Sequence, residues 1–123
     1  MTILVVEDNE DNRRLVFKRL RAAGHTLVEA VDVAQARARL KEGAPDLVLL
    51  DLQLPDGSGL DLVGEIRGDE ALRGVVVVAC TAFAYAQDRE DALSAGCDAY
   101  LSKPVDIRAL PSQLEEILHA AGR

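Results

Sequence analysis

The chain has 123 residues, which is the length of one ordinary domain with a single hydrophobic core. Hydrophobic residues make up 49% of it, enough to exclude a wholly disordered chain, and aromatic residues only 3%, so the core has to be aliphatic. The formal net charge of -7 argues against general binding to nucleic acid or to an anionic membrane, because both need a basic surface.

Short apolar runs, most of them rich in β-branched residues, mark the expected β-strands. In chain order the runs cover residues 3–6, 27–31, 47–50, 75–80 and, more weakly, 99–101. Strands that are apolar almost throughout are typical of a sheet that is covered on both faces. The pattern therefore predicts a parallel sheet with helices on each side.

Segments with helical periodicity lie between these runs, because their apolar residues recur three or four positions apart. The apolar positions are Val16, Leu20 and Ala23; Val33, Ala36 and Leu40; Leu62, Val63 and Ile66; Ala92, Leu93 and Ala95; and Ile107, Leu110, Leu114, Ile117 and Leu118. Five strands thus alternate with five helices, and right-handed crossovers leave few topologies for such a chain.

Capping residues agree with these boundaries. A left-handed residue is expected after four of the helical segments, at Gly24, Gly43, Gly68 and Gly96. Asp32 and Asp106 stand where helix N-caps are expected. Pro111 lies about one turn into the last helix and removes a backbone hydrogen bond to Ile107, so we expect that turn to be irregular or the helix to begin later.

The chain shows no internal repeat, linker or low-complexity tract, and it runs from the first strand to the fifth helix. We therefore expect residues 1–123 to form a single domain with no output domain.

Met1 leads directly into a strand-like run, and no apolar stretch approaches the length of a membrane span, so we expect a cytoplasmic protein. Cys80 and Cys97 fit no metal-ligand spacing and are expected to be buried packing residues.

Polar residues stand at the ends of four strands: Glu7 and Asp8, then Asp51, Thr81 and Lys103. Ligands of open α/β sheets bind outside the carboxyl ends of the strands, so these side chains are expected to form one cluster. Each has a simpler explanation by itself, since an acid pair can interact with a helix dipole, a threonine can cap or pack, and a lysine is usually just exposed. Their coincidence favours a functional site.

The chemistry of such a cluster points to phosphoryl transfer. Three carboxylates at one edge repel each other, and a hard divalent cation relieves the repulsion. A sparse set of oxygen ligands favours Mg2+, which also binds phosphate oxygens. Asp51 is then a candidate carboxylate nucleophile toward phosphorus. Thr81 would donate a hydrogen bond to a phosphoryl oxygen, and Lys103 would place a positive charge beside it.

The segments that carry these residues resemble the signature segments of response-regulator receiver domains of two-component systems. They read VVEDN, LVLLDLQLPDGSG, ACTAFA and LSKP, and the similarity extends from the first strand to the last helix. Together the motifs are highly specific, although each would be weak by itself. The resemblance implies a flavodoxin-like (βα)5 three-layer sandwich whose parallel five-stranded sheet has the order 2-1-3-4-5.

The resemblance also implies roles for the acidic residues. By motif position, Asp51 is the phosphoacceptor, Asp8 a direct Mg2+ ligand, and Glu7 a residue that acts on the metal through water. Asp51 and the backbone carbonyl of Gln53 are implied as further metal ligands. Glu7 stands where the family more often has Asp, and its longer side chain extends the reach of the carboxylate.

Further roles are implied for the second half of the site. Thr81 resembles the switch hydroxyl and Lys103 the phosphate-binding lysine, with a cis peptide between Lys103 and Pro104. Tyr100 matches the aromatic position that turns inward when Thr81 moves, and the less favoured alternative is a fixed, half-buried aromatic.

Two positions tune dephosphorylation in the family, and Gln53 and Phe83 occupy them here. An amide and a bulky aromatic at these places are expected to hinder the attacking water. Phe83 has an alternative explanation as an apolar plug over the loop.

The implied function is a signalling switch rather than a conventional enzyme. Its phosphoryl donor would be a sensor histidine kinase or a histidine phosphotransfer protein, docking on a rim formed by Asn9, Asn12, Arg13, Val16 and Pro104. The basic first helix is either a solvated face or part of that docking surface. The phosphorylated protein would signal through protein contacts or a phosphorelay, with no direct nucleic-acid or membrane partner, as a monomer or a phosphorylation-linked dimer.

Three alternatives remain at this point. A flavodoxin-like cofactor module would need a hydroxyl-rich phosphate loop after the first strand, and that loop is acidic here. An aspartyl-phosphate phosphatase of the haloacid dehalogenase type would need a second Asp where Gln53 stands. A degenerate receiver would be a constitutive interaction module, which the complete set of acids, threonine and lysine disfavours.

Overall fold

The computed structural model describes residues 1–82 and 86–122 and contains one parallel five-stranded sheet. Its strands are β1 (Thr2–Val6), β2 (Thr26–Ala30), β3 (Leu47–Asp51), β6 (Val76–Thr81) and β7 (Ala99–Ser102). They pair in the order β2-β1-β3-β6-β7, which is the order 2-1-3-4-5 of the five predicted strands. The implied flavodoxin-like topology is therefore confirmed.

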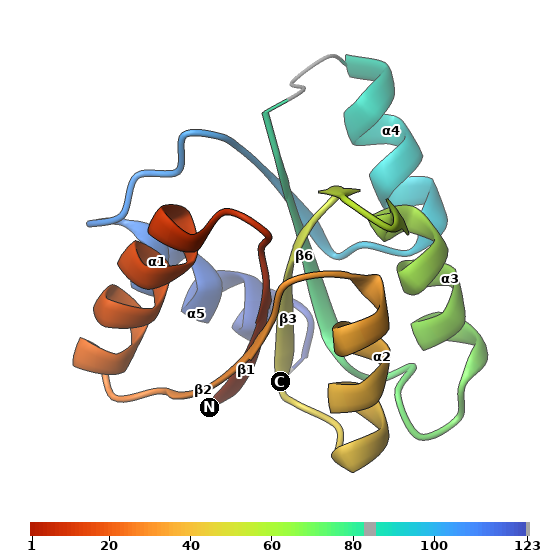
Figure 1. The fold of residues 1–123 in the computed structure, drawn as a ribbon, viewed down its shortest axis with the longest axis horizontal. Coiled ribbons are helices and arrows are strands. Elements are labelled where there is room, and N and C mark those ends of the chain that lie inside the picture. Colours follow the sequence, from red (N-terminus) through yellow and green to blue (C-terminus); the bar gives the residue numbers. More distant parts are fainter. Residues whose placement is uncertain (83–85, 123) are drawn as a thin grey trace.

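Five helices cover the two faces of this sheet (Figure 1). They are α1 (Glu10–Ala22), α2 (Val33–Glu42), α3 (Gly59–Gly68), α4 (Ala86–Ala95) and α5 (Leu110–Ala120). Helices α1 and α5 lie on one face, and α2, α3 and α4 lie on the other, so the molecule has the three layers expected (Figure 1).

The alternation of side chains along each strand divides the core into two aliphatic clusters. On β1, Ile3 and Val5 pack with α1 and α5, whereas Leu4 and Val6 pack with the helices of the opposite face. Both sets are almost fully buried, as a strand covered on two faces requires.

None of the helices in the described part of the chain is long and apolar enough to cross a membrane.

The helix boundaries confirm one predicted N-cap and correct the other. The Asp32 carboxylate accepts a hydrogen bond from the Gln35 backbone N–H at 2.8 Å and caps α2. Asp106 is not the N-cap of α5, because that helix begins only at Leu110 and has Pro111 in its first turn. The late start was expected, since proline is tolerated in a first turn but not further inside a helix. Asp106 instead accepts a hydrogen bond from Arg108 N–H in the preceding turn.

The prediction of left-handed glycines is confirmed at two positions and wrong at two. Gly24 has a φ of +93° and Gly96 a φ of +116°. Gly43 follows α2 with an extended backbone at φ 162°. Gly68 is the last residue of α3 itself, and Asp69 caps that helix with a β-region conformation. In both cases the chain leaves the helix directly in an extended direction and no left-handed turn is needed.

Two other expectations about apolar residues can be compared with the structure. Cys80 and Cys97 are buried free thiols, as expected. Burial raises the pKa of Cys80 to about 12 and that of Cys97 to about 11, so both are protonated at neutral pH. Ala23 and Leu93 lie outside the core, because Ala23 is the exposed C-cap of α1 and Leu93 is 42% exposed on α4.

A short antiparallel hairpin that the sequence did not predict connects β3 to α3. Its strands are β4 (Gln53–Leu54) and β5 (Gly57–Ser58), which pair with each other and not with the main sheet. The hairpin directly follows Asp51, so its geometry helps to determine where that side chain points.

Candidate functional site

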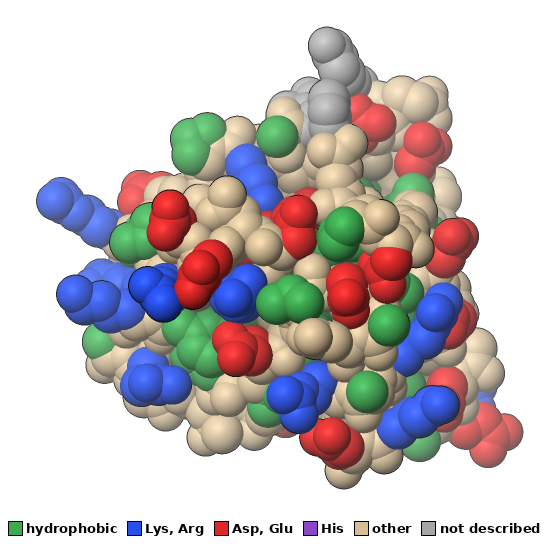
Figure 2. All heavy atoms as spheres, in the orientation of Figure 1, with side chains coloured by type: hydrophobic (Ala, Val, Ile, Leu, Met, Phe, Trp, Pro, Cys, Tyr) green, Lys and Arg blue, Asp and Glu red, His purple; other side chains and the backbone are tan. Residues whose placement is uncertain are grey.

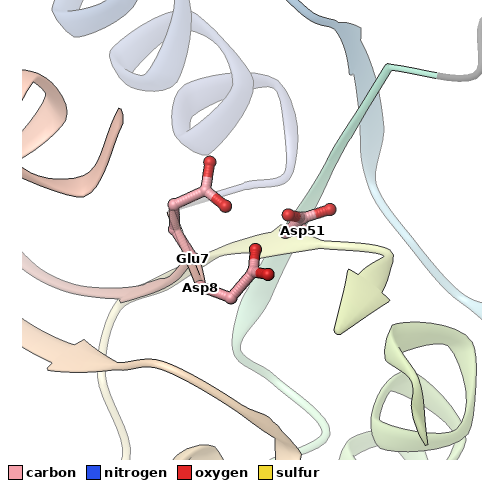
Figure 3. Close-up of side chains that lie close together, drawn as sticks. All are labelled: Glu7, Asp8 and Asp51. Atoms are coloured by element: carbon pink, nitrogen blue, oxygen red, sulfur yellow. The ribbon is translucent and has the colours of Figure 1, made fainter. Parts of the chain in front are cut away.

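Three carboxylates meet at the carboxyl edge of the sheet (Figure 3). Glu7 and Asp8 follow β1, and Asp51 is the last residue of β3, the strand that pairs with β1. One oxygen from each side chain lies within 4.8 Å of the others. Glu7 and Asp51 are each only 6% exposed, whereas Asp8 is exposed. The predicted acid cluster is thus assembled by the parallel register of two neighbouring strands.

Lys103 places its ammonium between two of these acids. Its Nζ donates to Glu7 Oε1 at 2.6 Å and to Asp51 Oδ2 at 3.1 Å. Burial lowers the pKa of Lys103, but the hydrogen bonds to Glu7 and Asp51 together outweigh it, so the net pKa is raised. The lysine is therefore a fixed positive charge within the acid cluster.

The backbone at Lys103 is held as tightly as its side chain. Its N–H donates to the carbonyl of Thr81 at 2.9 Å, and the Lys103–Pro104 peptide bond is cis, as the resemblance implied. Thr81 ends β6, pairs with Ser102 in β7 and is 2% exposed. The hydroxyl and the lysine thus come from adjacent strands at the edge that carries the acids.

A pocket of about 400 Å³ lies between the hairpin and α4, next to the end of β6. Its lining includes Thr81, Gln53 and Ser58, with two acidic residues of α4, Asp88 and Asp91. The side chain of Gln53 is exposed, and its backbone N–H donates to Asp51 Oδ1 at 3.0 Å. Gln53 therefore contacts Asp51 through its backbone N–H and lines a pocket that Thr81 also lines.

The second pocket at the site is about 420 Å³ and lies between α1 and the segment after β7. It contains Glu7, Asp51 and Lys103 at its base, and three of the five predicted rim residues line it: Asn12, Val16 and Pro104. Asn9 instead caps α1, because its side chain accepts from Asn12 N–H at 2.9 Å.

Arg13, the fifth predicted rim residue, does not line that pocket and has a different contact. Its Nη1 donates to the backbone carbonyl of Glu7 at 2.9 Å, and its Nε lies 3.2 Å from Glu29 Oε2 on β2. The guanidinium therefore ties the acid-bearing loop to the edge strand. The sequence placed Arg13 on the rim of the site but did not predict its contacts with Glu7 and Glu29.

Gly59, the first residue of α3, and Asp56, in the turn of the hairpin, also shape the site, and neither was singled out from the sequence. A Cβ at Gly59 would lie 2.8 Å from the backbone oxygen of Asp51 and 3.0 Å from Leu52 Cα. Asp56 accepts from Val33 N–H at 2.9 Å and from Ala34 N–H at 3.1 Å, which fixes the hairpin to the N-terminus of α2. The turn composition of the segment Pro55-Asp56-Gly57 was the available signal for Asp56.

The remaining predicted positions are Tyr100 and Phe83. Tyr100 lies on β7, is partly buried and packs against the core cluster on the side of α2, α3 and α4. Burial raises its pKa, and the charge of Asp88 adds to the effect. Phe83 lies outside the described residues.

The donor set suits a hard divalent cation. Three carboxylates, one of them exposed to solvent, offer only oxygen ligands and leave room for water, which is the environment that Mg2+ favours in proteins. The same edge carries a hydroxyl and an ammonium, which are groups that stabilise a phosphoryl group.

Comparison with known proteins agrees with this geometry. The chain matches the response regulator receiver domain over residues 3–115. It is 39% identical over 106 residues to the polar-differentiation response regulator DivK of Brucella ovis, and the match covers 86% of each chain.

Solved structures show the same likeness. A two-component response regulator from Clostridium difficile superposes with a TM-score of 0.90 at 27% identity, covering 97% of this chain and 96% of that one. The Mn2+-bound form of the response regulator Rcp1 superposes with a TM-score of 0.80 at 29% identity, covering 94% of this chain and 90% of that one. By its sequence and its fold, the chain belongs to the family of response regulator receiver domains.

Proposed function

We propose that the chain is a phosphorylation-dependent switch that accepts a phosphoryl group on Asp51. The observation that carries the proposal is the position of the Asp51 carboxylate, which lies at the base of a pocket, within 4.8 Å of two other acids and 3.1 Å from an ammonium. A carboxylate in such surroundings is oriented by its neighbours and can be approached from solvent.

In the proposed reaction, an Asp51 carboxylate oxygen attacks the phosphorus atom of a phosphohistidine on a sensor kinase or phosphotransfer protein. The new bond joins that oxygen to phosphorus, and the bond from phosphorus to the imidazole nitrogen breaks. Lys103, which already contacts Asp51, would pair with the transferred group, and the Thr81 hydroxyl would donate a hydrogen bond to it.

The proposal includes a resident Mg2+ held by Glu7, Asp8 and Asp51, with the backbone carbonyl of Gln53 as a further ligand. The oxygen-only donor set and the Mn2+-bound relative support this. When bound, the ion neutralises the acids and binds phosphate oxygens.

Phosphorylation is proposed to move the Thr81 hydroxyl and, with it, Tyr100. Thr81 and Tyr100 lie on adjacent paired strands, and the backbone of Lys103 is hydrogen-bonded to Thr81, so a shift at β6 reaches β7 directly. The exposed side chain of Leu93 and the surface of α4, β7 and α5 would then change their affinity for a downstream protein. Gln53 and Phe83 are proposed to tune the rate at which water removes the phosphoryl group.

The proposed setting is a cytoplasmic two-component pathway or phosphorelay. The donor would dock on the pocket that Asn12, Val16 and Pro104 line, because this pocket leads directly to Asp51. The readout would be a protein contact or onward transfer of the phosphoryl group, with the protein as a monomer or a phosphorylation-linked dimer.

The test is incubation with acetyl phosphate, with and without Mg2+, followed by measurement of the intact mass. We expect one phosphoryl adduct that requires Mg2+ and is absent from Asp51→Asn. The matched control is Asp61→Asn, which changes an exposed acid on α3 and should leave the adduct unchanged.

Three results would overturn the proposal. An adduct that persists in Asp51→Asn would place the phosphoryl group on another residue. A protein that forms no adduct with acetyl phosphate or with a phosphohistidine donor would be a constitutive interaction module. Turnover of many donor molecules per protein would instead indicate a phosphatase.

A further inference from the structure

Helix α1 carries a basic face that the proposed site does not use. Five of the chain's 14 Lys and Arg residues lie in this one helix, at Arg13, Arg14, Lys18, Arg19 and Arg21. Figure 2 shows Lys and Arg side chains gathered over α1, on the left of the molecule. The concentration is notable because the whole chain is acidic, with a formal net charge of -7.

The helical repeat places three of these basic residues on one face, together with Phe17. Arg14, Phe17, Lys18 and Arg21 are spaced three and four residues apart, so their side chains are neighbours on the helix surface. The core-facing residues Val16 and Leu20 point elsewhere, into the cluster beneath α1 and α5. The basic face is therefore separate from the face that packs against the sheet.

A groove of about 500 Å³ runs along this face, between α1 and the edge strand β2. The residues that line it include Arg13, Arg14, Phe17, Lys18, Arg21 and Glu29. Phe17 is partly buried against the core and contributes an apolar surface to the groove, which the basic residues also line. The groove lies on the opposite flank of α1 from the pocket that contains Asp51, which is lined from this helix by Asn12, Leu15 and Val16.

The cations of the groove are only partly neutralised within the chain. Arg14 pairs with Glu10 at 2.8 Å, but both side chains are well exposed, and such pairs contribute little. Arg13 pairs with Glu29. Among the residues that the structure describes, Lys18 and Arg21 form no ion pair. The groove thus offers two cations without an ion pair, Lys18 and Arg21, and a third, Arg14, whose ion pair with Glu10 is weakened by exposure to solvent.

We propose that this groove binds an acidic segment of a partner protein that also carries an apolar side chain. Carboxylates would pair with Arg14, Lys18 and Arg21, and the apolar side chain would pack on Phe17. A protein segment is favoured over nucleic acid or a lipid surface because the rest of the molecule is acidic and repels an extended polyanion. A short acidic segment would contact only the groove and would avoid the acidic remainder of the surface.

The groove also connects to the acid cluster through Arg13. The guanidinium that lines the groove donates to the carbonyl of Glu7, and its Nε faces Glu29. A partner carboxylate that competes with Glu29 for Arg13 would act on a residue that positions the acid-bearing loop. Binding at the groove is proposed independently of phosphorylation at Asp51.

The proposal can be tested with a short synthetic peptide that is rich in glutamate and has one central leucine. Chemical shifts of the backbone amides would be followed by NMR during a titration. We expect shifts confined to α1 and β2, an affinity that falls with added salt, and weakening by about tenfold in the double variant Lys18→Glu/Arg21→Glu. The variant Asp51→Asn should bind the peptide as the parent does, so this result does not depend on the proposed phosphorylation.

The matched control is Lys41→Glu/Arg73→Glu, which reverses two charges outside the groove and should leave the affinity unchanged. A peptide in which glutamine replaces every glutamate should bind weakly or not at all. Shifts spread over all lysines and arginines, or equal affinity in the two double variants, would overturn the proposal. Stronger binding to phosphatidylglycerol vesicles or to a DNA oligonucleotide than to the peptide would overturn it in favour of a membrane or a nucleic acid.

Discussion

The ammonium of Lys103 donates a 2.6 Å hydrogen bond to the carboxylate of Glu7, although the two residues are 96 positions apart in the chain. The same Nζ reaches Asp51 at 3.1 Å. Two nearly buried acids on neighbouring strands therefore share one cation. The side chain of Glu7 is one methylene longer than that of Asp, and its Oε1 reaches the ammonium of Lys103.

This arrangement predicts that Lys103 competes with Mg2+ for the acids. Replacing Lys103 with Met removes the competing charge, so we expect the variant to bind Mg2+ more tightly, by roughly tenfold for a partly screened ion pair. Isothermal titration calorimetry with MgCl2 measures the affinity. Lys41→Met, on the exposed surface of α2, is the control and should leave the affinity unchanged. An unchanged or weaker affinity in Lys103→Met would show that the lysine does not oppose the metal.

A second prediction concerns alkaline pH. The pKa of Lys103 is raised above the ordinary lysine value of 10.5 by its hydrogen bonds to Glu7 and Asp51, although burial by itself would lower it. A group whose pKa is higher in the folded state contributes stability at pH values below its unfolded pKa and loses it as the pH rises through the folded pKa.

We therefore expect the free energy of unfolding of the metal-free protein to exceed that of Lys103→Met by roughly 1–3 kcal/mol at neutral pH. The difference should shrink as the pH rises above about 10.5. Urea denaturation of both proteins at several pH values, followed by circular dichroism, checks this. A difference that is constant up to strongly alkaline pH would mean that the ion pair does not contribute.

The positions of the acids were predictable from the sequence, whereas their contacts were not. Asp51 could be assigned to a strand end because an apolar run stops there, and parallel strands bring their carboxyl ends to one edge. The distance from Lys103 to Glu7 depends on how the loop after β7 folds over that edge. The two hydrogen bonds of Arg13 likewise depend on the packing of α1 against β2. The spacing of residues in the sequence predicts neither the contact of Lys103 with Glu7 nor the hydrogen bonds of Arg13.

The errors at the helix ends have a similar origin. A glycine after a helical segment is compatible with a left-handed cap but does not require one. Gly43 continues into an extended segment, and Gly68 stays inside α3, because the next element determines the direction in which the chain must leave. The residue type determines which backbone conformations are allowed, and the tertiary structure determines which of them the residue adopts.

A third prediction follows from the link between the hairpin and α2. The hydrogen bonds from the backbone N–H groups of Val33 and Ala34 hold the pKa of Asp56 below the ordinary aspartate value of 3.8. Burial acts in the opposite direction but does not prevent the net decrease. A carboxylate with a lowered pKa contributes stability above its unfolded pKa and loses it as the pH falls through the folded pKa.

Asp56→Ala should therefore lower the midpoint of thermal unfolding at neutral pH, and the gap from the parent should narrow at pH values below 3.8. Thermal melts followed by circular dichroism at neutral and acidic pH measure the gap. Glu116→Ala, which removes an exposed carboxylate from α5, serves as the control and should show no such pattern. If the gap is as wide in acid as at neutral pH, the charge of Asp56 is not the cause.

The last prediction tests how closely α3 approaches the candidate phosphoacceptor. A Cβ at Gly59 would lie 2.8 Å from the backbone oxygen of Asp51 and 3.0 Å from Leu52 Cα, both of which are backbone atoms that cannot turn aside. Gly59→Ala must therefore move the start of α3 or the end of β3. We expect a loss of roughly 1–3 kcal/mol in the free energy of unfolding, as for other overpacked positions.

Gly64→Ala is a matched control in the same helix, because a Cβ at Gly64 meets nothing within 4 Å. It should be neutral or stabilising by about 0.5–1 kcal/mol, since alanine favours a helix interior over glycine. Under the proposed function, Gly59→Ala should also slow formation of the Asp51 adduct with acetyl phosphate, whereas Gly64→Ala should not. Urea denaturation and intact-mass time courses measure the two effects separately. Equal stability of the two variants would show that the chain after β3 can yield, and that the contact at Gly59 does not fix the position of Asp51.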